Sequence, residues 1–135
     1  MNRLGIFAGV AGFALLATAV PIAAHHSFAA EYDRTRTITV TGSVTKLEWT
    51  NPHARVYVLG ADETGKTQEW DFELGPPNGL MRNGWRRDSL KAGHKVTVEG
   101  FRSKTSTVVA NARSVKLADG RQVLAGSSFD TGPVQ

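Results

Sequence analysis

The chain has 135 residues, of which 41% are hydrophobic and 21% are charged, a composition typical of one soluble globular domain. Sixteen Lys and Arg residues against twelve Asp and Glu give a formal net charge of +4, and the basic residues are scattered rather than gathered into the dense stripe of a dedicated nucleic-acid-binding protein. The absence of cysteine excludes disulfides, thiolate metal sites and cysteine nucleophiles.

The first 24 residues have the pattern of a secretory signal peptide. Arg3 precedes an uncharged apolar run over residues 4–20, and small residues follow it up to Ala24. We therefore expect a mature protein that begins at His25 and is periplasmic or secreted. The alternative is an uncleaved membrane anchor, for which a run of about 17 residues is at the short limit. No cysteine follows the run, so a lipoprotein anchor is excluded.

The first part of the mature chain predicts three β-strands. Residues 36–49 predict a long first strand whose apolar positions change parity beside Gly42, so we expect a bulge or bend at this glycine. Residues 53–58 and 68–74 each alternate apolar and polar side chains on either side of the polar turn at residues 60–66. These two segments therefore predict an antiparallel hairpin.

The second part predicts one short helix and further strands. The two adjacent prolines within residues 75–79 cannot continue a ladder, so the hairpin ends there. Residues 80–90 could hold a short helix, interrupted by Gly84. Two more strands and a turn leading into a short extended segment follow: residues 94–101, 108–117, 119–120 and 122–124.

This order of elements predicts a mainly β fold. We expect a small five-stranded OB-like barrel over residues 36–125 with one short helix. An N-terminal extension (residues 25–35) precedes it, and a flexible tail (residues 126–135) follows it. Another small β-roll or a β-sandwich is the alternative.

Several motifs of the mature chain recur in a known family. They are HHSF at residues 25–28, VTGSV at residues 40–44 and EWTNPHA at residues 48–54, and residues 84–85, 90–93 and 110–115 fit the same pattern. Together they resemble the DUF6152 family of small exported bacterial proteins, a domain of unknown function. The resemblance covers nearly all of the mature chain. It implies a periplasmic OB-like β domain and no established activity.

The histidines are the candidate metal ligands. If processing makes His25 N-terminal, its α-amine and imidazole can chelate one ion, and His26 or His53 can complete a three-nitrogen site that suits Cu(II). Cleavage after Ala23 would instead put an imidazole at the third position, which allows a square-planar Cu(II) or Ni(II) site. His53 lies opposite in parity to the apolar residues of its strand, whereas His94 is expected to be half-buried and structural. The alternative is incidental copper binding at the terminus, with His53 capping a loop.

Aromatic and basic residues at the ends of the predicted elements form a second candidate surface for a ligand or partner: Trp49, Asn51, Trp85, Arg86 and Arg87. Tryptophans in such places can stack on bases or sugars, and Arg86 and Arg87, with Arg82, can hold a phosphate, a sulfated glycan or an anionic lipid headgroup. The alternative is that the tryptophans close the end of the barrel and the arginines lie on a solvated connection, partly paired with Asp88. Trp70 is expected in the core.

Catalysis has little support in this sequence. We find no Ser-His-Asp motif of recognisable spacing, no glycine-rich phosphate loop and no His-Glu-x-x-His helix. Glu69, Asp71 and Glu73 alternate outward, as on a solvated strand, and would repel a nucleic-acid backbone. We therefore predict a non-enzymatic binding or interaction module for an unidentified protein or small ligand, with no nucleic-acid partner and with membrane contact only if residues 1–24 are retained. A copper-binding protein is the alternative.

Overall fold

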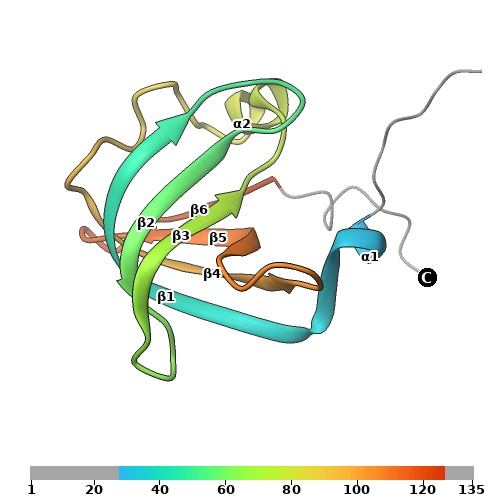
Figure 1. Cartoon of the computed structure of the whole chain (residues 1–135). Helices are drawn as coiled ribbons and strands as arrows, with labels where there is room; N and C mark the ends of the chain where they lie inside the picture. The colour runs from blue at the N-terminus through green and yellow to red at the C-terminus, as the bar shows by residue number, and fades with distance from the viewer. Residues whose placement is uncertain (1–27, 127–135) are drawn as a thin grey trace, which may run out of the picture.

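The computed structural model describes residues 28–126, which form six strands and two short helices (Figure 1). The strands are β1 (Tyr32–Glu48), β2 (Arg55–Ala61), β3 (Thr67–Glu73), β4 (Lys95–Ser103), β5 (Val109–Leu117) and β6 (Gln122–Leu124). The helices are α1 (Phe28–Glu31), before β1, and α2 (Pro77–Arg82), between β3 and β4. The mainly β class is confirmed. The predicted signal peptide, His25, His26 and residues 127–135 lie outside the described residues.

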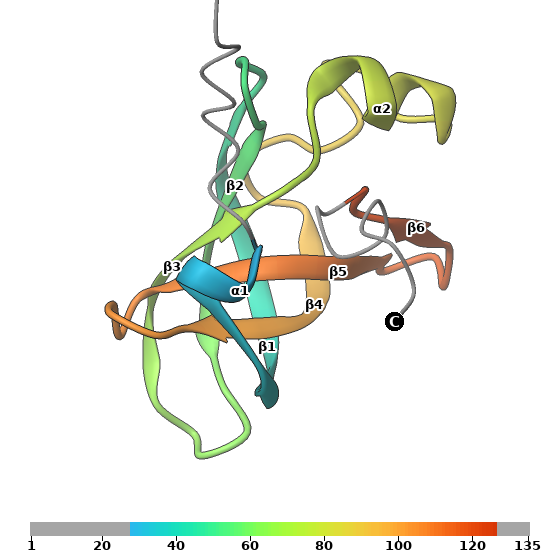
Figure 2. The same ribbon diagram turned by 90° about the vertical axis from the view of Figure 1, so that its right-hand side faces the viewer.

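The six strands form one sheet whose hydrogen bonding returns on itself. The strand order is β3-β2-β1-β4-β5-β6 with antiparallel neighbours, and an additional parallel pairing places residues 71–73 of β3 opposite residues 109–111 of β5. Strands β1, β2, β3, β5 and β4 are therefore bonded in a ring, which Figure 2 shows from the side of β5. The predicted β2–β3 hairpin is confirmed. Residues 122–124, expected only as an extended segment after a turn, pair with β5 as a sixth strand.

The hydrophobic core fills the inside of the ring, because alternate residues of each strand point inward. Every strand of the ring contributes to it: Ile38, Val40, Val44, Val56, Val58, Trp70, Phe72, Val96, Val98, Ala110, Ala112 and Val115. Trp70 is in the core as expected, 1% exposed, and its indole N–H donates to the carbonyl oxygen of Gly60 at 3.2 Å. Helix α2 lies at one end of the ring (Figure 1), where Leu80 and Trp85 join the same core.

Strand β1 contains the expected irregularity, but it does not lie at Gly42. Gly42 pairs in register with Gly60, and the register between β1 and β2 shifts only between Val44 and Lys46. The parity change of the apolar residues therefore arises at a bulge around Thr45. A Cβ at Gly42 would lie 2.2 Å from the carbonyl oxygen of Leu59, so this glycine serves close approach of two backbones instead.

Both helices differ from the expectation. Helix α2 begins at Pro77, three residues before the predicted segment, because proline fits the first turn of a helix, where its missing N–H is not needed. It ends at Arg82, and Gly84 follows with a φ of +89°, a conformation that favours glycine. Helix α1 was not predicted, and β1 begins at Tyr32, four residues earlier than expected. Neither helix is long and apolar enough to span a membrane.

Candidate functional site

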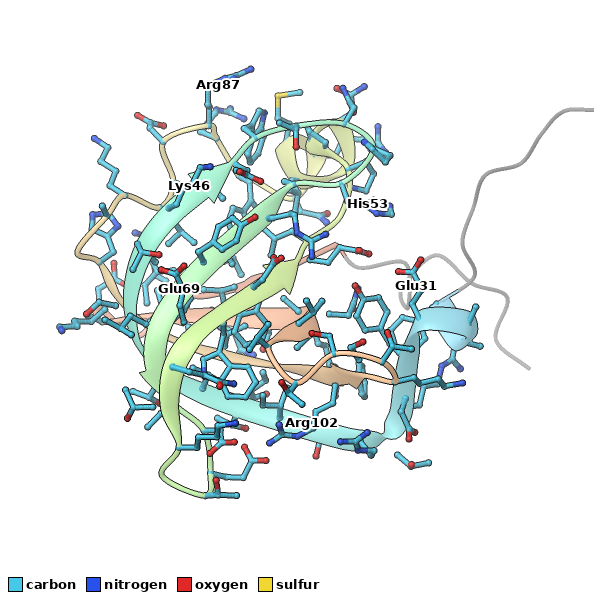
Figure 3. All side chains as sticks on the ribbon, in the orientation of Figure 1. Glu31, Lys46, His53, Glu69, Arg87 and Arg102 are labelled. Carbon is cyan, nitrogen blue, oxygen red and sulfur yellow. The ribbon has the colours of Figure 1, made fainter. Side chains whose placement is uncertain are left out.

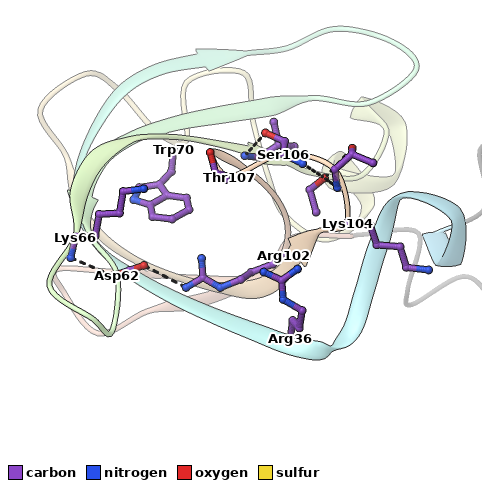
Figure 4. Close-up of a pocket in the computed structure, with 11 residues that line it drawn as sticks. Arg36, Asp62, Lys66, Trp70, Arg102, Lys104, Ser106 and Thr107 are labelled. Carbon is purple, nitrogen blue, oxygen red and sulfur yellow. Dashed lines mark hydrogen bonds and ion pairs between the residues drawn. The ribbon is translucent and has the colours of Figure 1, made fainter.

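A basic groove of about 270 Å³ lies beside Trp70, at the end of the molecule away from α2 (Figure 4). The start of β1, the β2–β3 turn, the end of β4 and the β4–β5 loop line it. Four of the lining side chains are cationic and one is a carboxylate: Arg36, Lys66, Arg102 and Lys104, and Asp62. This volume is just below the range of roughly 300–1,000 Å³ that is usual for pockets holding drug-sized ligands, so the groove fits a small ligand.

Asp62 and Arg102 form the fixed part of the basic groove. One oxygen of Asp62 accepts three hydrogen bonds, from the N–H (2.9 Å) and hydroxyl (2.6 Å) of Thr64 and from the N–H of Lys66 (3.1 Å). The other oxygen accepts from Nη2 of Arg102 at 3.1 Å. These hydrogen bonds, that from the Thr64 hydroxyl foremost, lower the pKa of Asp62 to about 2. The carboxylate is therefore ionised at neutral pH and holds the turn and β4 together.

Arg102 is held from two further sides. Its Nη2 also lies 2.8 Å from a carboxylate oxygen of Glu63, and its guanidinium carbon lies 5.6 Å from the centre of a Trp70 ring. Both of these contacts with carboxylates use Nη2. The Nε and Nη1 of Arg102 donate to no side chain or carbonyl oxygen within residues 28–126. Arg102 thus presents two unused donors from a position that is already fixed.

The remaining cations lie on other parts of the groove lining. The side chains of Arg36 and Lys66 are exposed, and neither forms an ion pair with a described residue. The ammonium group of Lys104 donates to the carbonyl oxygen of Ala29, and the backbone N–H of Lys104 donates to the carbonyl oxygen of Glu31 at 2.9 Å. These two hydrogen bonds join α1 to the start of the β4–β5 loop. An excess of positive charge in a concave site attracts anions.

Hydroxyl groups of the β4–β5 loop complete the lining. The Ser103 hydroxyl accepts the N–H groups of Thr105 and Ser106, both at 3.1 Å, and so shapes the turn. Ser106 does the same for the N–H groups of the two following valines at 3.2 Å. The side chains of Thr105 and Thr107 are exposed at the groove. They add hydroxyl donors beside the cationic groups.

This groove is not among the sites that the sequence predicted. Its residues come from positions 36, 62–70 and 102–109, which only the pairing of distant strands brings together. The one local signal is the sequence RSKTST at residues 102–107, where two basic residues and four hydroxyl residues follow one another at the end of a strand.

The predicted ligand His53 lies beside a buried carboxylate. Its Nδ1 is 3.3 Å from one oxygen of Glu73, whose other oxygen accepts the Tyr32 hydroxyl at 2.9 Å and lies 3.6 Å from Nη1 of Arg55. Glu73 is only 7% exposed, so the expected solvated face is wrong at this residue: Tyr32 and Arg55 cover it. Burial, and next the negative charge of Glu73, raise the pKa of Tyr32. Glu69, in contrast, is exposed as expected.

The other predicted metal ligands are not brought together by the described residues. His25 and His26 lie outside them, and residues 28–126 contain no group of three His, Asp or Glu side chains that could hold a metal ion. His94 is exposed, not half-buried, and its Nδ1 accepts the N–H of Lys91 at 3.3 Å. It therefore shapes the turn before β4.

The predicted aromatic and basic surface is divided by the structure. Trp85 is 1% exposed and packs in the core, so it has no face for stacking on a ligand, and Trp49 is partly buried against the same core. Asn51, Arg86 and Arg87 are exposed, and within the described chain neither arginine pairs with Asp88. Arg87 and Arg102 lie at opposite ends of the molecule (Figure 3), so these arginines are not part of the basic groove.

Comparison with models of known protein families gives a match. A family model described as "Family of unknown function (DUF6152)" matches residues 13–111, a range that includes every residue lining the basic groove. No curated protein and no solved structure matches the chain significantly.

Proposed function

Because the chain belongs to the DUF6152 family, whose description states no activity, we propose its function from its own surface: a non-enzymatic module that binds a small anionic ligand in the basic groove. The observation that carries this proposal is the charge of the lining, four cationic side chains against the single carboxylate of Asp62. Arg102 supplies fixed donors, while Arg36 and Lys66 supply charge without an ion-pair partner among the described residues.

The proposal includes the place of action and the finer fold. We infer that the module is periplasmic or secreted, because residues 1–24 have the pattern of a signal peptide. We also infer an OB-like barrel, which the ring order β1-β2-β3-β5-β4 and the position of α2 between β3 and β4 support. Small barrels of this kind bind ligands through their loops, and the basic groove is built largely from a turn and a loop.

Isothermal titration tests the binding proposal. The probes are inorganic phosphate, sulfate and citrate, with glucose as an uncharged control. The variant Arg36→Gln/Lys66→Gln removes two charges from the basic groove, and Arg86→Gln/Arg87→Gln removes two from the opposite end as a matched control. We expect saturable binding of at least one anion, weakened tenfold or more by the first variant only, and weaker at high salt. Binding of no anion, or equal loss in both variants, would refute the proposal.

A second candidate function, copper binding, is favoured by the surroundings of His53. The Nδ1 of His53 lies 3.3 Å from a carboxylate oxygen of Glu73, which leaves Nε2 as the nitrogen available to a metal ion, and the side chain is 31% exposed. Carboxylates orient metal-binding histidines in this way. In this candidate function, the α-amine and imidazole of His25, with His26 or His53, hold one Cu(II).

Copper titration of four proteins tests this second function. Protein that begins at His25 is compared with a form extended by one residue, in which the amine becomes an amide, and with His53→Ala and His94→Ala. We expect the extension and His53→Ala to weaken binding and His94→Ala to leave it unchanged. Equal, weak binding by all four proteins would refute the copper site.

A further inference from the structure

The basic groove has the features of a site for a phosphate ester, and we propose that its ligand is the phosphomonoester of a small polar molecule. This inference rests on the proposed anion binding and names the class of anion. Three properties of the groove carry it: its net charge, the geometry of its donors and its volume.

The charge of the lining favours a doubly charged group. Four lining cations, less Asp62 and the neighbouring Glu63 that pairs with Arg102, leave a net charge of +2 around a single small cavity. One carboxylate would leave half of this charge uncompensated, whereas a phosphoryl group concentrates about −1.5 to −2 in one tetrahedral group at neutral pH. Arg36, Lys66 and Lys104 come from three different segments of the lining (Figure 4).

The donors favour terminal phosphoryl oxygens. The guanidinium of Arg102 is fixed by Asp62, Glu63 and the ring of Trp70. Both carboxylates accept from its Nη2, so Nε and Nη1 each offer a separate donor to a phosphoryl oxygen. Since the side chain is already immobilised, binding costs little of its conformational entropy. The ammonium group of Lys66 and the hydroxyls of Thr105 and Thr107 remain for the other oxygens.

The volume indicates that the phosphoryl group carries an organic body. The groove equals the space of about nine water molecules at liquid density, whereas a phosphoryl group has only five heavy atoms. The rest of the lining is mixed, with the half-buried Val109 beside the threonine hydroxyls. Such a wall suits a sugar or polyol, which presents hydroxyl groups and C–H faces together.

Titration with matched ligands at two pH values tests the inference. The probes are glycerol 3-phosphate, glucose 6-phosphate, glucose 6-sulfate, inorganic phosphate and succinate. The groove lining holds no histidine, and Asp62, with a pKa of about 2, stays ionised between pH 8 and pH 5. The second ionisation of the phosphoryl group, near pH 6, is therefore what changes. We expect affinity for the phosphate esters to fall about tenfold from pH 8 to pH 5, and that for the sulfate ester to stay flat.

Each variant and each outcome has a defined meaning. Arg36→Gln and Lys66→Gln should each weaken the binding of glucose 6-phosphate about tenfold, whereas Arg86→Gln/Arg87→Gln should not; circular dichroism checks that each variant is folded. If inorganic phosphate binds as tightly as the esters, the inference that the ligand carries an organic body is overturned. Tighter binding of succinate or glucose 6-sulfate, or ester affinity independent of pH, would overturn the phosphoryl class but leave anion binding intact. Binding of no anion would overturn both proposals.

Discussion

Asp62 organises the basic groove without cancelling its charge. Its two oxygens accept three hydrogen bonds from the β2–β3 turn and one from Arg102, so a single carboxylate connects two segments of the lining, the turn and β4. Charge-assisted hydrogen bonds of this kind are roughly twice as strong as neutral ones. Asp62 adds one negative charge to the groove, whose lining contains four cationic side chains.

The lowered pKa of Asp62 predicts a defined acid dependence of stability. An aspartate in the unfolded chain titrates near 3.9, so the unfolded state binds the proton more readily than the folded state. The stabilisation from Asp62 is therefore complete above about pH 4 and is lost as the pH falls through about 2. We expect Asp62→Asn to lower the free energy of unfolding at pH 7 and to flatten its decline between pH 4 and pH 2, as measured by urea unfolding.

Asp88→Asn is the matched control for this measurement, because Asp88 is exposed and forms no ion pair with a described residue. Its unfolding curves should follow those of the unmodified protein at every pH. An Asp62→Asn protein with the same decline as the unmodified one would mean that the turn does not depend on this charge.

Single residues also show where sequence reasoning stops. Alternation predicted correctly that Glu69 points outward and that Trp70 points inward. The burial of Glu73 could not be predicted, because its cover comes from Tyr32, forty-one positions earlier in the chain. A pattern within one strand gives the direction of a side chain but not what lies over it.

Among the elements, β1 contains a bulge and a close approach to β2, and a glycine in the sequence could mark either of them. A glycine in a strand is equally consistent with a bulge and with close approach of another backbone. The apolar pattern showed that β1 changes parity, and Gly42 was the obvious place for it, but the bulge lies at Thr45. Strand pairing decides between the two uses, since Gly42 lies directly opposite Gly60.

Replacement of Gly42 by alanine should therefore destabilise the protein by about 1–3 kcal/mol, the usual cost of overpacking. A Cβ there would lie 2.2 Å from the carbonyl oxygen of Leu59 and 2.5 Å from the Cα of Gly60, so β1 and β2 must move apart. Urea unfolding at pH 7 measures the loss. The exposed substitution Thr37→Ala in the same strand should change stability by no more than about 0.5 kcal/mol. If both variants unfold at the same urea concentration, the close approach of β1 and β2 at Gly42 does not contribute to stability.

For the whole molecule, the parallel pairing of β3 with β5 turns a sheet into a ring. Alternation and turn residues sufficed to predict strands β1 to β5 but not β6, and the order of the strands suggested closure. The basic groove could not be predicted in the same way, because Arg36, Lys66 and Arg102 are separated by 30 or more positions and meet only when the ring forms. The sequence instead drew attention to Arg86 and Arg87, which are neighbours along the chain but lie at the other end of the fold.

Ring closure predicts slow hydrogen exchange at Asp71. Its N–H donates to the carbonyl oxygen of Val108 at 2.9 Å, so β3 has a partner on the side where an open sheet would leave it free. We expect this amide to exchange only through global unfolding, as slowly as amides in the middle of β4. The N–H of Thr64, bonded within an exposed turn, should exchange much faster. Fast exchange at Asp71, followed by NMR in D₂O, would show that β3 is an open edge.

Because residues 36, 62–70 and 102–109 are assembled only by folding, the unfolded chain offers a ligand no comparable site. Thermodynamic linkage then makes any occupant of the basic groove a stabiliser of the native state: a ligand at one hundred times its Kd adds about 2.7 kcal/mol. For a domain of this size that corresponds to a rise in Tm of roughly ten degrees. Heat denaturation can therefore rank a whole collection of phosphorylated metabolites on the native protein, before any biological role is known.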